Sequence, residues 1–129
     1  ISVADAASKL VKATKPSDFE LNLFTSIALG DGQQANNPWL QELPDPITRA
    51  AWDNYITMSF ADARALGFSN PIKDNGAIDG DYAKLSVNGV DIVAPVMIQP
   101  GQAKGSFGLA LGYGRTQGLK DAMQVGVNA

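Results

Sequence analysis

Apolar and polar residues alternate along several segments of this chain, and the period of that alternation predicts strands. Residues 19–27 place apolar side chains at every second position, so we expect a strand there, and a central one. Shorter strands are predicted over residues 55–58 and 106–111. Near the C-terminus the pattern weakens, with only Leu119 and Met123 at helical spacing.

A hairpin gives the strongest local signal in the sequence. Residues 82–87 and 90–98 both read as strands, and Asn88 and Gly89 stand between them. Both residues tolerate the positive φ that a two-residue hairpin turn requires. Because strands dominate and lie close together along the chain, the pattern favours a mainly β protein with short helices, arranged as a small barrel.

Two short helices are predicted from capping residues and helical spacing. The first begins at Ser2 and ends before Pro16. The second begins at Ser59, which forms a capping box with Asp62, and ends at Gly67. The apolar face of the first helix consists of Val3, Ala6, Ala7 and Leu10.

A long irregular segment, residues 30–46, follows the first predicted strand. It is rich in Gly, Asn, Asp and Pro, yet Trp39 and Leu43 give it an apolar face. A loop of this length inside a compact domain is either functional or a sign that an element was missed. We predict that it docks on another protein surface; the alternative is that Trp39 covers the open end of a barrel. The candidate interface residues are Asn36, Asn37, Pro38, Trp39 and Leu40.

Composition removes several classes of chemistry. The chain has 129 residues, with 10 Lys and Arg, 13 Asp and Glu, no Cys and no His. Disulfides, thiolate-bound metals, iron-sulfur ligation, Ser-His-Asp triads and HExxH zinc sites are therefore absent from it. A net charge of −3 argues against nucleic-acid binding. No apolar stretch approaches the ~20 residues that span a bilayer, so we expect no direct membrane insertion and a soluble fragment.

A dinucleotide-binding pattern is present but sits in the wrong context. Gly30, Gly32 and Ala35 fit the spacing GxGxxA after a strand. That motif holds pyrophosphate at the start of the helix that follows, whereas the residues 36–38 oppose a helix running on from these glycines. We therefore expect a plain glycine turn.

The acidic residues between 74 and 81 invite a comparison with calcium loops. Asp74, Asp79 and Asp81 lie near glycines, but the ligand order of an EF-hand is missing. A solvated turn is the favoured interpretation.

Other polar and aromatic residues have a functional and a plain interpretation. Glu42, Asp45 and Asp53 have the chemistry of an acid and base pair, although surface carboxylates are the default. Arg115 follows a Gly-Tyr-Gly step and is the arginine best placed to meet a phosphate, or else a surface residue at a strand end. For Trp39, a core position and an interface anchor remain open.

Five segments stand in a characteristic order. They are residues 54–67 (NYITMSFADARALG), 79–81 (DGD), 87–89 (VNG), 99–101 (QPG) and 109–114 (LALGYG). In order and spacing they resemble the C-terminal domain of molybdopterin oxidoreductases, and the final GVNA is similar to its closing motif. The resemblance implies a double-psi β-barrel, which in that family binds the dinucleotide of the molybdenum cofactor.

A narrower resemblance rests on residues 29–32, 35–46 and 111–116. These segments are similar to the large iron-sulfur subunit of alternative complex III, a bacterial quinol:cytochrome c oxidoreductase. That subunit keeps the architecture but is described as lacking molybdenum. The resemblance implies no cofactor in this fragment and iron-sulfur clusters elsewhere in the parent subunit. It also implies partners in the other domains and subunits of a membrane-bound respiratory complex, on the periplasmic face of the bacterial inner membrane.

Departures from the cofactor-binding pattern point the same way. Cofactor-binding relatives usually follow the first strand with a Gly-Arg type step, where this chain has Ser26 and Ile27. They often carry Asn where Ser59 stands, whereas Asp62 is retained. Replacing a cation near a phosphate by Ile27 removes charge-assisted hydrogen bonds of roughly 1.5 to 3 kcal/mol each.

We therefore expect a mainly β chain with short helices, folded as a double-psi β-barrel similar to the molybdopterin dinucleotide-binding domain. Residues 1–129 would be a single barrel domain excised from a larger subunit, with a helical lead-in (1–16), the barrel (19–114) and a tail (115–129). The expected function is cofactor-free structural support of electron transfer, with no catalysis by the fragment. The alternatives are a molybdopterin guanine dinucleotide-binding domain of a molybdenum oxidoreductase and a free-standing ligand-binding barrel.

Overall fold

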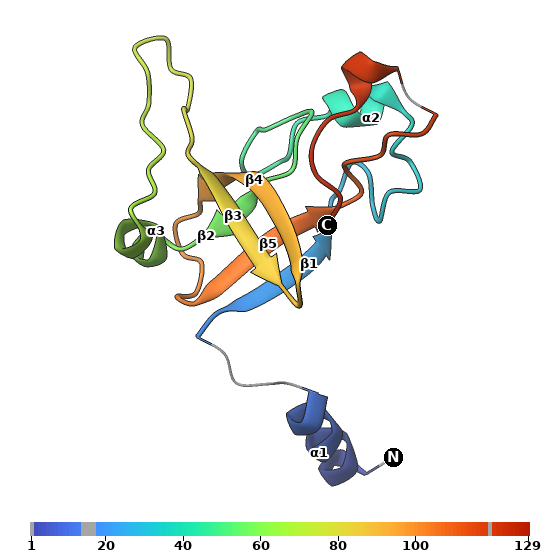
Figure 1. The fold of residues 1–129 in the computed structure, drawn as a ribbon, viewed down its shortest axis with the longest axis vertical. Coiled ribbons are helices and arrows are strands. Elements are labelled where there is room, and N and C mark those ends of the chain that lie inside the picture. The colour runs from blue at the N-terminus through green and yellow to red at the C-terminus, as the bar shows by residue number, and fades with distance from the viewer. Residues whose placement is uncertain (1, 14–17, 119) are drawn as a thin grey trace.

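The computed structural model describes residues 2–13, 18–118 and 120–129, and in these ranges the chain is mainly β with short helices (Figure 1). This confirms the predicted fold class. The strands are β1 (Glu20–Thr25), β2 (Ile56–Met58), β3 (Tyr82–Val87), β4 (Val90–Ile98) and β5 (Ser106–Leu111). The helices are α1 (Val3–Ala13), α2 (Pro38–Glu42), α3 (Phe60–Leu66) and the 3-10 turn η1 (Asp121–Met123). Pro16 and Leu119 lie outside the described residues.

The strands form one mixed sheet in the order β1-β5-β2-β4-β3. Strand β5 runs parallel to β1 and antiparallel to β2, and so fills the gap between two strands that are consecutive in the sequence. Strand β2 is parallel to β4, which pairs with β3 as a hairpin. Within the described ranges the sheet is open, with β1 and β3 at its edges, and these pairings do not close the expected barrel.

Strand β1 is an edge strand, which corrects the prediction of a central one. It pairs only with β5, and most of its side chains are exposed. The alternation of apolar positions was read correctly as a strand, but Leu21 alone is half-buried. Glu20 and Asn22, on the opposite face, are typical of an edge strand because charged and polar residues there discourage further pairing. At its start, the ring of Phe19 packs on that of Phe107, with centroids 5.0 Å apart.

The core lies where β2, β4 and β5 meet α3, and Figure 1 shows α3 beside this end of the sheet. On the opposite face of the sheet from this cluster, Gly108 pairs with Thr57 across β5 and β2. A Cβ at this position would stand 2.5 Å from Thr57 Oγ1, a contact that side chains do not tolerate. The buried apolar residues of this cluster are Ile56, Met58, Ala63, Ala83, Ala94, Val96, Phe107 and Leu109.

The predicted hairpin is confirmed with the same strand bounds. Asn88 has a φ of 51° and Gly89 a φ of 84°, so both turn residues are left-handed. Positive φ at both positions defines the type of two-residue turn whose twist matches that of the flanking strands. Val87 and Val90 form the last pair of the ladder.

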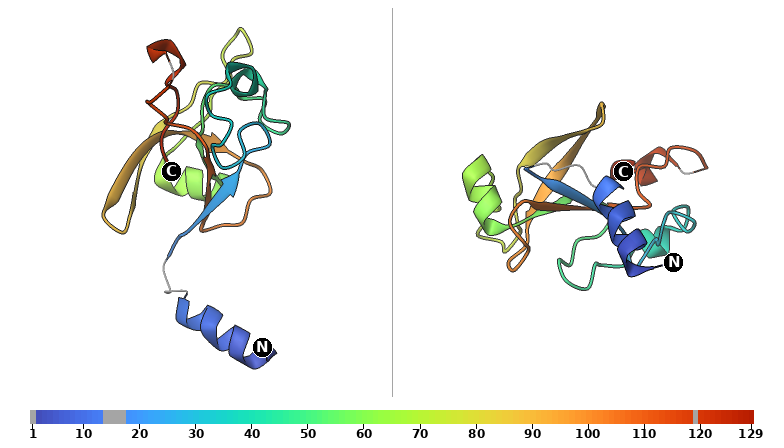
Figure 2. Two further views of the ribbon diagram at one scale, coloured as in Figure 1. Left: turned by 90° about the vertical axis from the view of Figure 1, so that its right-hand side faces the viewer. Right: turned by 90° about the horizontal axis from the view of Figure 1, so that it is seen from below.

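The predicted helix caps are also confirmed. The Ser59 hydroxyl accepts from the backbone N–H of Asp62 at 3.0 Å, and Gly67 ends α3 with a φ of 81°. At the start of α1, the Ser2 hydroxyl accepts from the N–H of Asp5 at 3.1 Å. Figures 1 and 2 show α1 standing apart from the sheet. Of the helices described, none is long and apolar enough to cross a membrane.

The sequence pattern does not predict helix α2, which gives regular structure to part of residues 30–46, a segment expected to be mostly irregular. Asn37 is its N-cap, with Oδ1 accepting from the N–H of Trp39 at 3.1 Å, and Pro38 occupies the first turn. Proline is favoured there because its missing N–H would have no partner inside the helix. Residues 36–38 prevent a helix from continuing out of the preceding glycine turn. Two of them, Asn37 and Pro38, instead begin helix α2.

The turn geometry predicts a strong difference between two substitutions at Gly89. Gly89→Val should lower the melting temperature, because a β-branched residue in the left-handed region costs about 1 to 2 kcal/mol. Gly89→Asn should lower it much less, since Asn tolerates this conformation. Thermal unfolding followed by circular dichroism measures both. Equal melting temperatures for the Val variant and the wild type would contradict the assigned turn.

Candidate functional site

A buried amide holds the C-terminal segment against the end of the sheet. Asn54 is only 1% exposed, and its Nδ2 donates to the carbonyl oxygens of Ala110 and Val127, both at 2.9 Å. Its Oδ1 accepts from the N–H of Val127 at 2.8 Å. One side chain therefore joins the segment that leads into β2, the end of β5 and the C-terminal residues. We call this arrangement the Asn54 clasp.

Two glycines let the C-terminal segment come this close. A Cβ at Gly114 would stand 2.2 Å from the backbone N of Asn128, and one at Gly126 would stand 2.7 Å from Asn54 Oδ1. The φ of Gly114 is 73° and that of Gly126 is 75°, so both also adopt the left-handed conformation that glycine permits. The segment therefore packs on the main chain at Gly114 and on the side chains of Asn54 and Tyr113 at Gly126.

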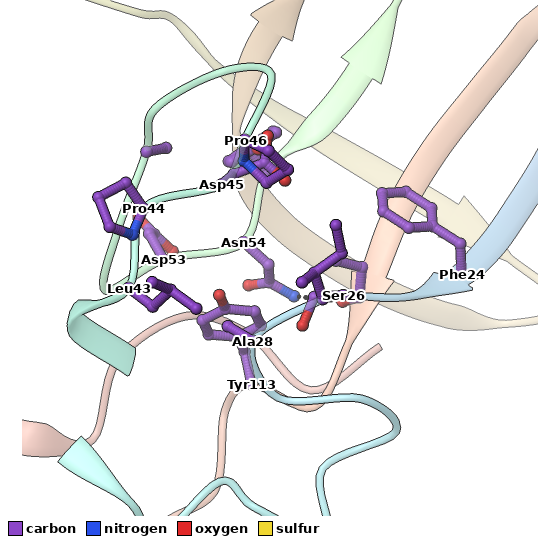
Figure 3. Close-up of a pocket in the computed structure, with 14 residues that line it drawn as sticks. Phe24, Ser26, Ala28, Leu43, Pro44, Asp45, Pro46, Asp53, Asn54 and Tyr113 are labelled. Carbon is purple, nitrogen blue, oxygen red and sulfur yellow. Dashed lines mark hydrogen bonds between the residues drawn. The ribbon is translucent and has the colours of Figure 1, made fainter. Parts of the chain in front are cut away.

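Beside the Asn54 clasp lies a small enclosed pocket of about 30 Å³, drawn in Figure 3. That volume holds about one or two water molecules. Asp53 and Tyr113 lie on the same side of the pocket as Leu43, and Phe24 of β1 lies on the opposite side (Figure 3). The residues that line it are Phe24, Ser26, Ile27, Ala28, Leu43, Pro44, Asp45, Pro46, Ala50, Asp53, Asn54, Tyr55, Ala110 and Tyr113.

The electrostatics of this pocket are those of a site that resists negative charge. Burial raises the pKa of Asp53 above its ordinary value. Burial also raises the pKa of Tyr113, with smaller contributions from Tyr55, Asp45 and Asp53. The pKa of Tyr55 is raised chiefly by burial as well, and its hydroxyl is hydrogen-bonded to that of Thr48. A phosphate placed here would meet carboxylates and no cationic side chain among the lining residues.

A second, larger cavity of about 640 Å³ lies between the glycine turn after β1 and the segment after β5. A Cβ at Gly32 would stand 3.1 Å from Gly112 Cα, so the two turns touch through their main chains. The sequence suggests phosphate binding at two separate places, the glycine pattern around Gly32 and the cation of Arg115. In the structure both line the same cavity. The residues that line this glycine cavity are Asp31, Gly32, Ala35, Leu111, Gly112, Tyr113, Gly114, Arg115, Thr116, Gln117, Gly118, Asn128 and Ala129.

The glycine cavity fits a dinucleotide phosphate poorly. The guanidinium of Arg115 donates to Gly32 O at 3.2 Å and to Asn36 Oδ1 at 3.3 Å, so it ties the two turns to each other. Asp31 lines the same cavity and would repel a phosphate. Ile27, the apolar residue that follows β1 and Ser26, is 77% exposed. The guanidinium of Arg115 therefore serves to hold the two loops together.

The predicted interface residues surround the start of α2. Asn36 accepts from Arg115, Asn37 caps the helix, and Pro38 occupies its first turn. Trp39 is 81% exposed and Leu40 is half-buried. The alternative that Trp39 belongs to the core is therefore wrong, because its side chain lies almost entirely in solvent.

The loop that carries Trp39 is held by its own hydrogen bonds. Gln41 is buried and donates from Nε2 to Ala35 O at 2.6 Å, and its main-chain carbonyl oxygen accepts from the N–H of Trp52 at 2.9 Å. Farther on, Asp45 Oδ1 accepts from the N–H groups of Ile47 and Thr48 at 2.9 and 2.8 Å. These contacts fix the position from which Trp39 projects.

A separate polar cluster at the start of α3 was predicted only in part. The Ser59 hydroxyl donates to Asp62 Oδ2 at 2.6 Å, and the N–H of Gly105 donates to the same oxygen at 2.8 Å. These two hydrogen bonds, the Ser59 bond first, hold the pKa of Asp62 below its ordinary value. Capping was visible in the sequence, whereas the contact with Gly105 spans 43 residues and had no local signal.

The remaining acidic candidates do not share one site. Asp45 and Asp53 line the enclosed pocket together, but Glu42 is not among its lining residues. In the segment between α3 and β3, residues 67–81, Asp79 pairs with Lys73 at 2.9 Å, and Asp81 accepts from the N–H of Ser69 at 2.7 Å. In the described ranges, no group of three or more carboxylates converges as metal ligands would.

Comparison with known proteins adds no family to these observations. No protein-family model matches the chain, and no curated protein sequence matches it significantly. Function is therefore argued from the geometry and from the sequence resemblance.

Two acidic residues should show opposite effects of neutralisation. Asp62 has a lowered pKa, so its stabilising contribution is complete above the ordinary pKa and is lost as the pH falls through the folded value. Asp53 has a raised pKa, so its charge destabilises the fold at neutral pH, and this effect disappears as the pH falls through the folded value. Asp62→Asn should lower stability at pH 7, and Asp53→Asn should leave it equal or higher.

Urea unfolding at pH 7 and at about pH 3, below the unfolded pKa of a carboxyl group, measures both effects. The Asp62→Asn variant should also lose part of the decline in stability that the wild type shows on acidification. An equal loss of stability in both variants at pH 7 would contradict the assigned environments.

Proposed function

We propose that this chain is a non-catalytic domain that packs against other protein, within the iron-sulfur subunit of a bacterial quinol:cytochrome c oxidoreductase of the alternative complex III type. In that role it supports electron transfer without binding a cofactor of its own, on the periplasmic face of the inner membrane. The observation that carries the packing role is the exposure of large apolar side chains near α2.

Three of the large apolar side chains that are exposed lie near α2. Ile27 and Leu43 line the same pocket, and Trp39 precedes Leu43 by one turn of α2. Their exposed fractions are 77%, 47% and 81%. We call Ile27, Trp39 and Leu43 the α2 face. Large apolar side chains grouped in this way typically mark a protein interface.

The charge around the α2 face indicates the kind of partner. Residues 27–55 contain Asp31, Glu42, Asp45 and Asp53 but only one basic residue, Arg49, so the rest of the chain has nine acidic and nine basic residues. The whole net charge of −3 therefore belongs to this segment. A partner surface with an apolar centre and Lys or Arg at its rim would be complementary.

The finer fold assignment, a double-psi β-barrel, belongs to the same proposal. It is supported by strand β5, which enters between the consecutive strands β1 and β2 with opposite directions relative to them. Further support comes from the contact between residues 29–32 and 111–116, which meet where Gly32 touches Gly112. Both of these segments carry the resemblance to the alternative complex III subunit.

A second candidate function, binding of a molybdopterin guanine dinucleotide, is favoured by one observation. The glycine cavity is large enough for a nucleotide and is lined by main chain and by Arg115. Against it stand the internal hydrogen bonds of Arg115 and the carboxylate of Asp31. For this reason the cofactor-free role is preferred.

The two candidates differ in their response to guanine nucleotide. Titration of the protein with GDP in a calorimeter should give no binding heat above that of dilution. Ile27→Arg, which restores a cation after β1, is the matched variant, and adenosine diphosphate is the control ligand. Micromolar affinity of the wild type for GDP would support the dinucleotide-binding function instead.

The packing role predicts that Trp39 matters for assembly and little for folding. Trp39→Ala should change the free energy of unfolding by less than about 0.5 kcal/mol, because the side chain is exposed. It should weaken association with the partner by about 2 kcal/mol or more, as truncation of an aromatic anchor does.

Val90→Ala, at the tip of the β3–β4 hairpin, is the control, since Val90 is also exposed and lies outside the α2 face. Assembly is followed by isolating the respiratory complex from cells that carry each variant of the full-length subunit. Normal assembly of the Trp39→Ala subunit would show that the α2 face is not the docking surface.

A further inference from the structure

Four steps in this chain place an Asn or Asp directly before glycine. Such steps are chemically labile because the main-chain nitrogen of a glycine reaches the preceding side chain without hindrance from a Cβ. We propose that Asn88 is the site at which the folded protein deamidates and forms isoaspartate, and that the other three steps are protected by their hydrogen bonds. The steps are Asp31-Gly32, Asn75-Gly76, Asp79-Gly80 and Asn88-Gly89.

The reaction needs only water. The backbone nitrogen of Gly89 loses its proton and attacks Cγ of Asn88, the bond from Cγ to Nδ2 breaks, and ammonia leaves. The product is a five-membered succinimide. Water then opens one of its two bonds to nitrogen, which yields either an aspartyl or an isoaspartyl residue at position 88.

Asn88 and Gly89 are free to react in this way. Both are exposed at the tip of the hairpin, outside the β3–β4 ladder, which ends at the pair Val87 and Val90. Over the described ranges, neither the side chain of Asn88 nor the N–H of Gly89 makes a hydrogen bond. Fluctuation at the tip can therefore bring nucleophile and amide together without breaking an existing contact.

The other Asn-Gly step is restrained at both reacting groups. Asn75 Oδ1 accepts from the N–H of Ala77 at 3.1 Å, and the N–H of Gly76 donates to Lys73 O at 2.8 Å. Ring closure at Asn75 requires both hydrogen bonds to break. A net hydrogen bond of ordinary strength corresponds to a factor of about five in population, so two of them should slow the reaction markedly.

The Asp-Gly steps are restrained as well. Asp31 Oδ1 accepts from the N–H of Gln33 at 3.2 Å, and the N–H of Gly32 donates to Leu29 O at 3.0 Å. Asp79 is paired with Lys73 at 2.9 Å. These contacts occupy the carboxylate of both residues and, at Asp31, the attacking nitrogen too.

Isoaspartate at position 88 would alter the hairpin. The main chain would be longer by one methylene group in a turn that has room for two residues of ordinary length. Its new carboxylate would also lie near Asp91, which holds Lys84 at 2.6 Å and Ser86 at 2.5 Å. The exposed carboxylate at the turn is the kind of group that a carboxyl methyltransferase specific for isoaspartate accepts.

The test compares both Asn-Gly steps in the intact protein and in the same protein unfolded in urea. Each sample is incubated at 37 °C (about 310 K) in mildly alkaline buffer, digested, and analysed by mass spectrometry for the amide-to-acid mass change. In urea the two steps should convert at similar rates. In the folded protein, Asn88 should convert at least about five times faster than Asn75.

Methyl transfer from S-adenosylmethionine by an isoaspartate-specific methyltransferase provides a second readout. Incubated wild type should become a methyl acceptor, whereas Asn88→Gln should not, because the longer side chain closes a ring far more slowly. Equal conversion of Asn75 and Asn88 in the folded protein, or undiminished methyl acceptance by Asn88→Gln, would overturn the proposal. Neither outcome bears on the packing function, which rests on the α2 face.

Discussion

The buried amide of Asn54 is the interaction on which the arrangement of the candidate sites depends. Its three hydrogen bonds join the approach to β2, the end of β5 and the C-terminal residues. The buried amide is stable because both its nitrogen and its oxygen have hydrogen-bond partners. An apolar side chain at position 54 would leave the N–H and the carbonyl oxygen of Val127 without the hydrogen bonds that Asn54 now makes to them. Asn54 itself lines the enclosed pocket, and the glycine cavity borders the segment that Asn54 holds.

Glycine supplies the second condition for this arrangement. Gly32 and Gly112 touch through their main chains, and Gly114 touches the main chain of Asn128. Two loops and a terminus thereby approach one another more closely than side chains would allow, and Arg115 completes the junction by bonding across it. A glycine-rich arrangement that suggests phosphate binding in the sequence thus acts, in the fold, as a joint between loops.

Elements determined by local interactions were predictable from the sequence, and those determined by distant contacts were not. The turn at Asn88 and the cap at Ser59 depend on residues within three positions, so their signals survive in the sequence. The edge position of β1 depends on which strands pair, and within residues 19–27 only the polar side chains of Glu20 and Asn22 indicate it. The role of Asn54 depends on Val127, 73 residues away. Helix α2 is locally encoded by Asn37 and Pro38, because proline interrupts a helix that runs on from the preceding glycines but is favoured in the first turn of a new one.

The apolar core of this chain is small, and several large apolar side chains lie on its surface. The main apolar cluster contains three alanines among its eight buried residues, while Ile27 and Trp39 remain in solvent. Hydrophobic side chains left outside such a core contribute to stability only when another surface covers them. The loop that presents Trp39 is already held by Gln41 and Asp45, so little conformational entropy is lost when a partner covers it. In the proposed packing role, a neighbour would supply burial that this sheet does not provide for itself.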